Sequence, residues 1–208
     1  MKNLLSLCAV AFLASACALT TDRIDVPYQT PGTATPVAGA STASVSVVAH
    51  DGRTVYQDRL STKKNGYGME MAPILANNDI PQTVGMAVEQ ELKAQGFQIG
   101  PGHAALSVDV IRFYNDFKIG FFSGDAIADV EIHVTVRDPA NSIVFVGDYE
   151  GAGKEADVLM ASGSNARAAL IKAFQNTLNT LISDHGLQAA ILAAQTPKAP
   201  AAGSAPSS

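Results

Sequence analysis

The chain has 208 residues, of which 47% are apolar and 16% charged, and its formal net charge is −5 at pH 7. This length suits one domain of about 150 residues with additional terminal segments. The sequence has no basic patch or extended lysine/arginine run, which excludes nucleic acid as an expected partner and electrostatic attachment to anionic lipid as the expected anchor.

The first 17 residues have the pattern of a bacterial lipoprotein signal. Lys2 supplies a positive charge, residues 4–13 are apolar, and three small residues lead directly into Cys17. The apolar stretch is too short to cross a bilayer. We expect residues 1–16 to be removed and Cys17, whose thiol is the nucleophile that accepts the lipid, to become a lipidated N-terminus. An ordinary secretory signal with a cysteine at the cut is the alternative.

The three small residues and Cys17 form a lipobox, the cleavage and lipidation motif of lipoprotein signals. This motif accounts for both cysteines, because Cys8 would leave with the signal and Cys17 would be acylated. The folded domain is therefore expected to contain no disulfide. Residues 18–43 are rich in Thr, Pro, Ala and Gly, so they and Cys17 are predicted to form a lipidated, flexible tether. Residues 194–208 have a similar Pro/Ala bias and are predicted to be a disordered tail, which leaves residues 44–193 as the domain.

The first half of this domain predicts a strand and a helix. Apolar residues alternate along residues 44–49, which is typical of a strand. Residues 54–78 are harder to assign, since residues 63–68 fit either a hairpin turn or a loop. Asp79 then has the position of a helix cap, and an apolar stripe recurs every four residues until Gly96, which is expected to end the helix.

The second half predicts three strands and a helix. Residues 106–113 alternate with a phase shift at Ile111, which indicates either a bulge or a strand covered on both faces. Residues 126–137 have the clearest period-2 pattern, and residues 143–149 follow as a hairpin partner. An amphipathic helix starts near Ser164 or Asn165 and continues through Ile182, with Gly186 expected to end or kink it.

This order of elements predicts an α+β fold. We expect a two-layer sandwich in which two helices cover one face of a mixed or mostly antiparallel sheet of about four strands. Asp129, Glu131 and Arg137 share one face of the clearest strand, so the second face of the sheet is expected to be open to solvent.

The sequence contains no recognisable catalytic, cofactor or metal motif. The histidines at positions 50, 103, 133 and 185 lack the spacing of metal ligands. Asp129 and Glu131 lie about 7 Å apart on one strand face, as carboxylate pairs do, but exposed strands show this spacing routinely. A hydrolase would need a cleft that gathers His133, Asp129 and Glu131 against a buried nucleophile. We therefore predict no enzyme activity and no cofactor.

One apolar segment lies where a connection between strands is expected. Phe117, Ile119, Phe121 and Phe122 could form an exposed patch for a partner protein or for the membrane surface. The alternative is that the strands extend further and these side chains pack in the core. Replacing Phe121 and Phe122 with serine would separate the two hypotheses.

The chain resembles the YajG family of bacterial lipoproteins, which is largely uncharacterised. The resemblance covers about residues 43–191 and rests on the lipobox and on three stretches, residues 90–101, 126–132 and 165–181. It implies acyl acceptance at Cys17 and no catalytic residue.

The resemblance and the signal together predict a lipid-anchored protein of the outer membrane whose domain faces the periplasm, since Ala18 rather than aspartate follows the cysteine. We expect a non-enzymatic accessory or binding module in envelope maintenance or assembly, with the membrane and an envelope protein as partners. An envelope hydrolase and a carrier of lipid or a small ligand are the alternatives.

Overall fold

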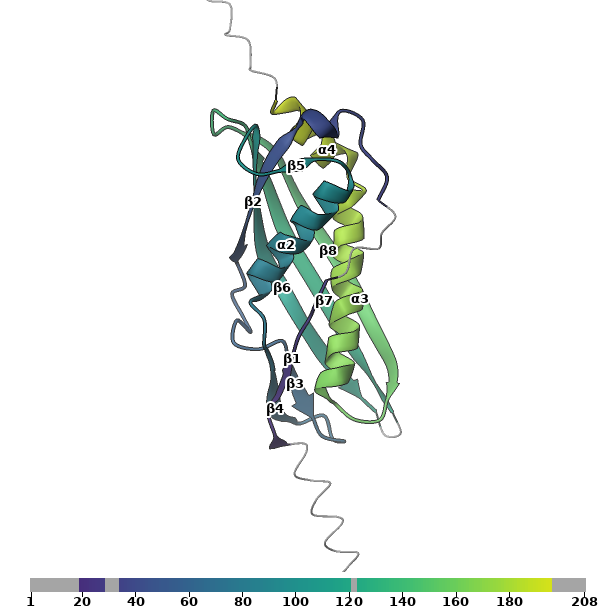
Figure 1. Cartoon of the computed structure of the whole chain (residues 1–208). Coiled ribbons are helices and arrows are strands. Elements are labelled where there is room, and N and C mark those ends of the chain that lie inside the picture. The colour runs from purple at the N-terminus through teal and green to yellow at the C-terminus, as the bar shows by residue number, and fades with distance from the viewer. Residues whose placement is uncertain (1–18, 29–33, 121–122, 196–208) are drawn as a thin grey trace, which may run out of the picture.

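The computed structural model describes residues 19–28, 34–120 and 123–195 (Figure 1). A mixed sheet carries three helices on one of its faces. The strands are β1 (Asp22–Ile24), β2 (Ser44–Asp51), β3 (Ser61–Lys64), β4 (Glu70–Ala76), β5 (Gln98–Ile99), β6 (Ala104–Ile119), β7 (Gly124–Arg137) and β8 (Ile143–Val158). The helices are α2 (Ile80–Ala94), α3 (Gly163–Ile182) and α4 (His185–Ala193), and a 3-10 turn, η1 (Ala40–Thr42), precedes β2.

The α+β class and the mixed sheet are confirmed, but eight described strands replace the predicted four. The antiparallel ribbon β6–β7–β8 forms the long part of the sheet. Along the free edge of β6, β2 pairs in parallel with residues 104–110, and β3 pairs in parallel at Asn115. The register shift between Val110 and Arg112 confirms the predicted bulge. The strands that the sequence did not assign are β1, β3, β4 and β5: β3 pairs with β6 and β4, β1 pairs with β4, and β5 pairs with β2.

Residues 54–78 form the hairpin β3–β4, so the hairpin alternative is correct. Asn65 organises its turn, since the Asn65 side-chain oxygen accepts hydrogen bonds from the backbone N–H groups of Tyr67 and Met69, at 3.0 and 3.1 Å. Short polar side chains that bond to nearby backbone groups stabilise such turns.

The helix-covered face of the sheet contains the core. Every second residue of β7 from Ala126 to Val136 is completely buried, as the alternation predicted. Helix α2 packs on β2 and β6, while α3 packs on β7 and β8. Phe174 of α3 lies edge-on to Phe113 of β6, with ring centroids 5.5 Å apart. Burial of these apolar side chains is the main contribution to stability.

Helix α3 approaches β8 so closely that only glycine fits at two strand positions. A Cβ atom at Gly151 would lie 2.4 Å from the backbone nitrogen of Thr177, and one at Gly153 would lie 2.1 Å from the carbonyl oxygen of Ala169. The glycines in β8 therefore mark a close backbone approach. They also explain why the predicted strand 143–149 was too short, since glycine weakens the strand pattern of residues 150–158.

The C-terminal helical region differs from the prediction at Gly186. Helix α3 ends at Ile182, and Asp184 starts a separate helix by accepting hydrogen bonds from the backbone N–H groups of Gly186 and Leu187, at 2.7 and 3.2 Å. Gly186 therefore lies in the first turn of α4 rather than at the end of α3, because the aspartate cap determines where the new helix begins.

The predicted tether is wrong where residues 18–43 are described. Strand β1 pairs in parallel with β4, from Asp22 opposite Ile74 to Ile24 opposite Ala76. Val26 is completely buried, and so are Ala40 and Ala43 before β2. The Thr/Pro/Ala/Gly-rich composition of the segment outweighed the alternation of Ile24, Val26 and Tyr28 in the prediction. These three side chains add to the core next to α2 and α3.

Candidate functional site

Of the four residues of the possible partner patch, the structure describes Phe117 and Ile119, and both pack against the core. Phe117 is 1% exposed and belongs to the core, and Ile119 is half-buried against it. For these two residues the surface-patch hypothesis is wrong and the core-packing alternative is correct. The reason is that β6 extends to Ile119 and turns Phe117 toward the helices. Phe121, Phe122 and the predicted lipid acceptor Cys17 lie outside the described residues.

The predicted carboxylates and histidine lie on the open face of the sheet. The register places a row across four strands, from His50 opposite Asp109, through His133, to Asp148. His133 Nδ1 lies 2.6 Å from Asp148 Oδ1, and the two side chains are 34% and 71% exposed. This geometry is that of a solvated cross-strand pair, which contributes little to stability.

The carboxylates next to His133 do not form a cleft with it. Asp129 lies 3.5 Å from the guanidinium of Arg112, while Glu131 lies directly opposite Arg112 on β6 and Glu150 on β8. The neighbouring positions of β7 point into the core. The structure therefore brings Asp129, Glu131 and His133 together on the strand face that the described helices leave open to solvent (Figure 1).

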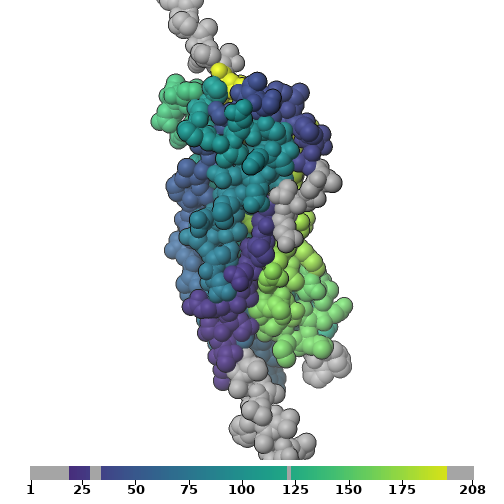
Figure 2. Space-filling view, in the orientation of Figure 1, coloured from purple at the N-terminus to yellow at the C-terminus, as the bar shows by residue number. Residues whose placement is uncertain are grey.

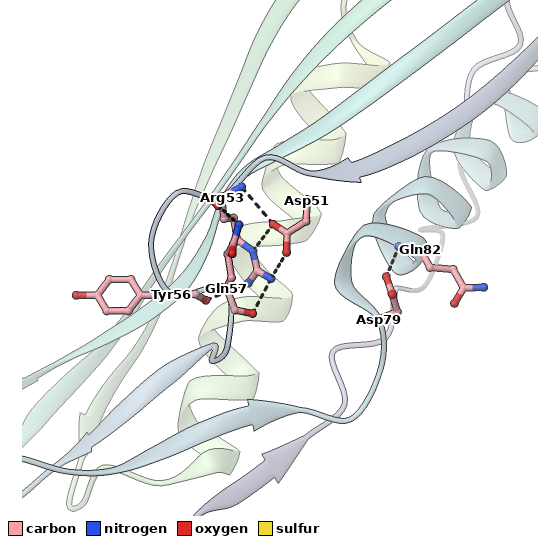
Figure 3. A network of polar contacts seen from close by, with 6 residues as sticks. All are labelled: Asp51, Arg53, Tyr56, Gln57, Asp79 and Gln82. Carbon is pink, nitrogen blue, oxygen red and sulfur yellow. Dashed lines mark hydrogen bonds and ion pairs between the residues drawn. The ribbon is translucent and has the colours of Figure 1, made fainter.

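A polar network that the sequence did not predict orders the loop between β2 and β3 (Figure 3). The Arg53 guanidinium binds Asp51 through two parallel hydrogen bonds, from Nε at 2.8 Å and from Nη2 at 2.7 Å. It also donates to the carbonyl oxygens of Tyr56 and Gln57, at 3.4 and 3.2 Å. Gln57 in turn donates to the Arg53 carbonyl, so the loop closes around a buried arginine.

The electrostatics of this network follow from the paired charges. Hydrogen bonds from Arg53 hold the pKa of the Asp51 carboxyl below its usual value, against the opposing effect of partial burial. The bidentate geometry uses the arginine fork that would otherwise bind an anionic ligand. The Arg53 side chain is thus occupied in holding the loop.

The loop has a second consequence for the open face. It carries the Tyr56 ring onto that of Tyr114 in β6, with centroids 4.1 Å apart and planes 16° from parallel. Tyr114 faces the open side of the sheet, opposite Asp129, yet is only 8% exposed. Burial raises the pKa of Tyr114, and a hydrogen bond with Thr62 opposes that shift. The Arg53 loop therefore covers one part of the otherwise open face.

A pocket of about 330 Å³ lies between this loop and the start of α2. Its polar walls include Asp51, Arg53, Arg59 and Asp79. Asp79 Oδ1 accepts the backbone N–H of Gln82 at 2.8 Å and caps the helix, and Arg59 pairs with Asp58 at 2.7 Å. Each of these groups already has a partner within the fold.

A buried carboxylate was also missed in the sequence. Glu91 of α2 is 1% exposed and accepts a hydrogen bond from the Tyr28 hydroxyl at 2.5 Å. Burial, with further contributions from Glu91, raises the pKa of Tyr28 well above its usual range. The Tyr28 ring lies 5.3 Å from that of Phe174 in α3. The pair fastens the N-terminal segment to both helices, and the alternation of Ile24, Val26 and Tyr28 was the signal that could have revealed it.

Two features of residues 19–28, 34–120 and 123–195 bear on the class of site. Within these ranges no group of three or more His, Cys, Asp or Glu side chains could hold a metal ion. Over the same described residues no helix has the length and apolar character required to span a membrane.

Comparison with known proteins identifies one family. The profile of a family described as an uncharacterised lipoprotein matches residues 31–192 of the chain. No curated protein matches. The matched residues include every described strand and helix from η1 onward, up to the penultimate residue of α4.

Three solved structures of low identity resemble the chain. A Xanthomonas campestris protein has 16% identity and a TM-score of 0.49, covering 85% of this chain and 98% of its own. A minor lipoprotein from Acinetobacter baumannii has 12% identity and a TM-score of 0.35, covering 76% and 97%. A lipoprotein from Neisseria meningitidis has 14% identity and a TM-score of 0.33, covering 68% and 99%. At these scores the three structures add nothing to the assignment of the chain.

Proposed function

The chain belongs to this family of uncharacterised lipoproteins, as its resemblance to YajG lipoproteins predicted, and from that membership we propose that it is a lipid-anchored, non-enzymatic accessory protein of the cell envelope. We place the anchor at Cys17 in the outer membrane and the domain in the periplasm. The observation that carries this proposal is a lipoprotein family match directly downstream of a lipobox.

The arrangement of polar groups supports a non-enzymatic role. Arg53 is held by Asp51 and two carbonyls, Glu91 by Tyr28, and Asp184 by Tyr149 at 2.8 Å. Each contact leaves its charged group occupied, and those of Glu91 and Asp184 also join separate segments of the fold. Catalysis instead requires a nucleophile and a base that face a substrate.

Metabolic labelling with a palmitate analogue tests the anchor. We expect Cys17→Ser to abolish labelling and to release the domain from membranes. Cys8→Ser is the matched control, because it removes the chain's other cysteine and should label normally. Labelling that persists in Cys17→Ser would refute the assignment.

Density-gradient fractionation tests the membrane. The wild-type protein should separate with the outer membrane, and Ala18→Asp should shift it to the inner membrane if the residue after Cys17 directs sorting. Crosslinking in intact cells followed by mass spectrometry then identifies the envelope partner. An accessory role predicts that Asp129→Asn and Glu131→Gln leave the recovered partner unchanged, whereas a hydrolase that uses these carboxylates would lose activity.

A further inference from the structure

We infer that the end of the domain formed by the β3–β4 turn and the β8–α3 connection rests directly on the lipid bilayer and inserts apolar side chains into its surface. The inference rests on the proposed function, because it takes Cys17 as the lipidated residue. It adds an orientation and a second membrane contact, which the anchor alone does not provide.

The short distance along the chain between Cys17 and the fold is the first argument. Leu19 is the first described residue and Asp22 already belongs to the sheet. An extended chain spans at most about 3.6 Å per residue, so Leu19 lies within about 7 Å of Cys17 and Asp22 within about 18 Å. A lipid on Cys17 therefore leaves no room for a long tether, and this end of the domain must lie at the membrane.

Asp22 fixes the start of the chain to this end of the fold. One of its carboxylate oxygens lies 2.7 Å from Lys63 Nζ of β3. The other accepts the backbone N–H of Gly163, the first residue of α3, at 2.8 Å. The start of β1 is thus held against both β3 and the first turn of α3. Figure 1 shows β1, β3, β4 and the beginning of α3 at the lower end of the molecule, and Figure 2 shows the N-terminal purple atoms at the same end.

At the same end, several large apolar side chains are unusually exposed to solvent. Tyr67 in the β3–β4 turn is 90% exposed and Leu159 after β8 is 87% exposed, which are the highest values among the large apolar residues described. Their neighbours Met69 and Met160 are 58% and 65% exposed, and Leu19 is 64% exposed. Tyrosine is enriched at membrane interfaces, and exposed apolar side chains gathered at one end indicate a contact surface.

A shallow depression lies next to the β3–β4 turn. Gly68, between Tyr67 and Met69, lines a pocket of about 720 Å³ together with Lys118 of β6 and Asp157 near the end of β8. Gly124 pairs with Val158, which places Leu159 at the same end of the ribbon. The depression and the exposed apolar tips therefore lie at the same end of the ribbon, which a lipid surface could contact at several points.

Charge indicates which lipids would be recognised. The lysines around the depression are paired: Lys64 and Lys118 with Asp116, at 2.5 and 2.7 Å, and Lys154 with Asp125, at 2.8 Å. Paired lysines give little net attraction to anionic headgroups. Apolar insertion therefore dominates, and the contact should depend only weakly on the charge of the lipid.

Tryptophan fluorescence tests the orientation, because the chain contains no tryptophan. We would reconstitute the acylated full-length protein, carrying Tyr67→Trp or Leu159→Trp, in phosphatidylcholine vesicles with brominated acyl chains. Ile143→Trp is the matched control, since Ile143 is 54% exposed and pairs with Arg137. That pair lies about 40 Å along the ribbon from Gly124.

We expect bromolipid to quench the emission of Tyr67→Trp and Leu159→Trp several-fold and to leave Ile143→Trp unchanged. Adding phosphatidylglycerol should not alter these values. Unquenched reporters in acylated, vesicle-bound protein would overturn the inference while leaving the anchor intact, and would indicate a protein partner for this end. If the wild-type protein proves not to be acylated, that result would instead overturn the proposed function, and this inference with it.

Discussion

Neighbouring residues of β7 meet opposite environments. Val134 is completely buried beneath the helices, whereas His133 is exposed on the open face and pairs with Asp148. The covered face consists of interlocked apolar side chains and close backbone contacts, while the open face consists of solvated pairs. Stability is therefore concentrated on one face of the sheet, and the other face is free to vary.

The largest expected effect is on the covered face, at Phe117. Phe117→Ala should lower the free energy of unfolding by about 4 kcal/mol, because it leaves a cavity in the core. Urea denaturation followed by circular dichroism measures the change, with the half-buried Ile119→Ala as a milder comparison. Unchanged stability would restore the surface-patch hypothesis for this residue.

Gly153 tests the close approach of α3 to the covered face. Gly153→Ala should cost about 3 kcal/mol, because its Cβ would meet the Ala169 carbonyl at 2.1 Å and force the helix away. Gly66→Ala is the control, since a Cβ there has no described neighbour within 4 Å. Equal melting temperatures for the two variants would contradict the close packing.

Arg53 lies where a loop covers part of the open face. Arg53→Met should cost about 2 kcal/mol, because Asp51 loses its partner and Tyr56 is no longer held over Tyr114. Hydrogen exchange of residues 54–60 should accelerate. Arg59→Met, which breaks the exposed pair with Asp58, should have little effect.

The Arg53 variant also predicts a pH dependence. Arg53 lowers the folded-state pKa of Asp51 below its unfolded value, so the stabilisation is complete above the unfolded pKa and is lost as pH falls through the folded pKa. The difference in stability between wild type and Arg53→Met should therefore shrink below about pH 4. A difference that stays constant under acid would show that the arginine acts through packing alone.

The smallest effect is expected on the open face. His133→Gln should change the free energy of unfolding by less than about 0.5 kcal/mol, since the pair with Asp148 is exposed. Thermal unfolding at neutral pH measures this value. A loss of several kcal/mol would mean that the two faces differ less than their burial indicates.

Much of the fold was predictable where a pattern is local. The alternation of residues 126–137, the helix cap at Asp79 and the phase shift at Ile111 each depend on neighbouring residues, and β7, α2 and the β6 bulge follow from them. Strand β1 was missed because its partner Ile74 lies some fifty residues away from Asp22. The extension of β8 was missed because its glycines are required by the close approach of α3 and do not follow the residue pattern of a strand.

The candidate sites were less predictable than the fold. Asp51 and Arg53 are near neighbours in sequence, but the burial of Arg53 depends on the loop that returns to it through Tyr56 and Gln57. Asp129, Glu131 and His133 share one face of β7, as the alternation predicted, yet this face is open to solvent (Figure 1). A cleft forms only where separate segments of the chain pack together. The spacing of residues within one strand does not predict which segments pack together.

The sequence by itself determined the lipobox, the two faces of β7 and the helix cap at Asp79, because these depend on residue type and on periods of two or 3.6 residues. Only the tertiary structure decided that Asp22 is held by Lys63 and Gly163, which places the start of β1 at the same end of the fold as Tyr67 and Leu159. These contacts join segments far apart in sequence, and their energies depend on how the elements pack together.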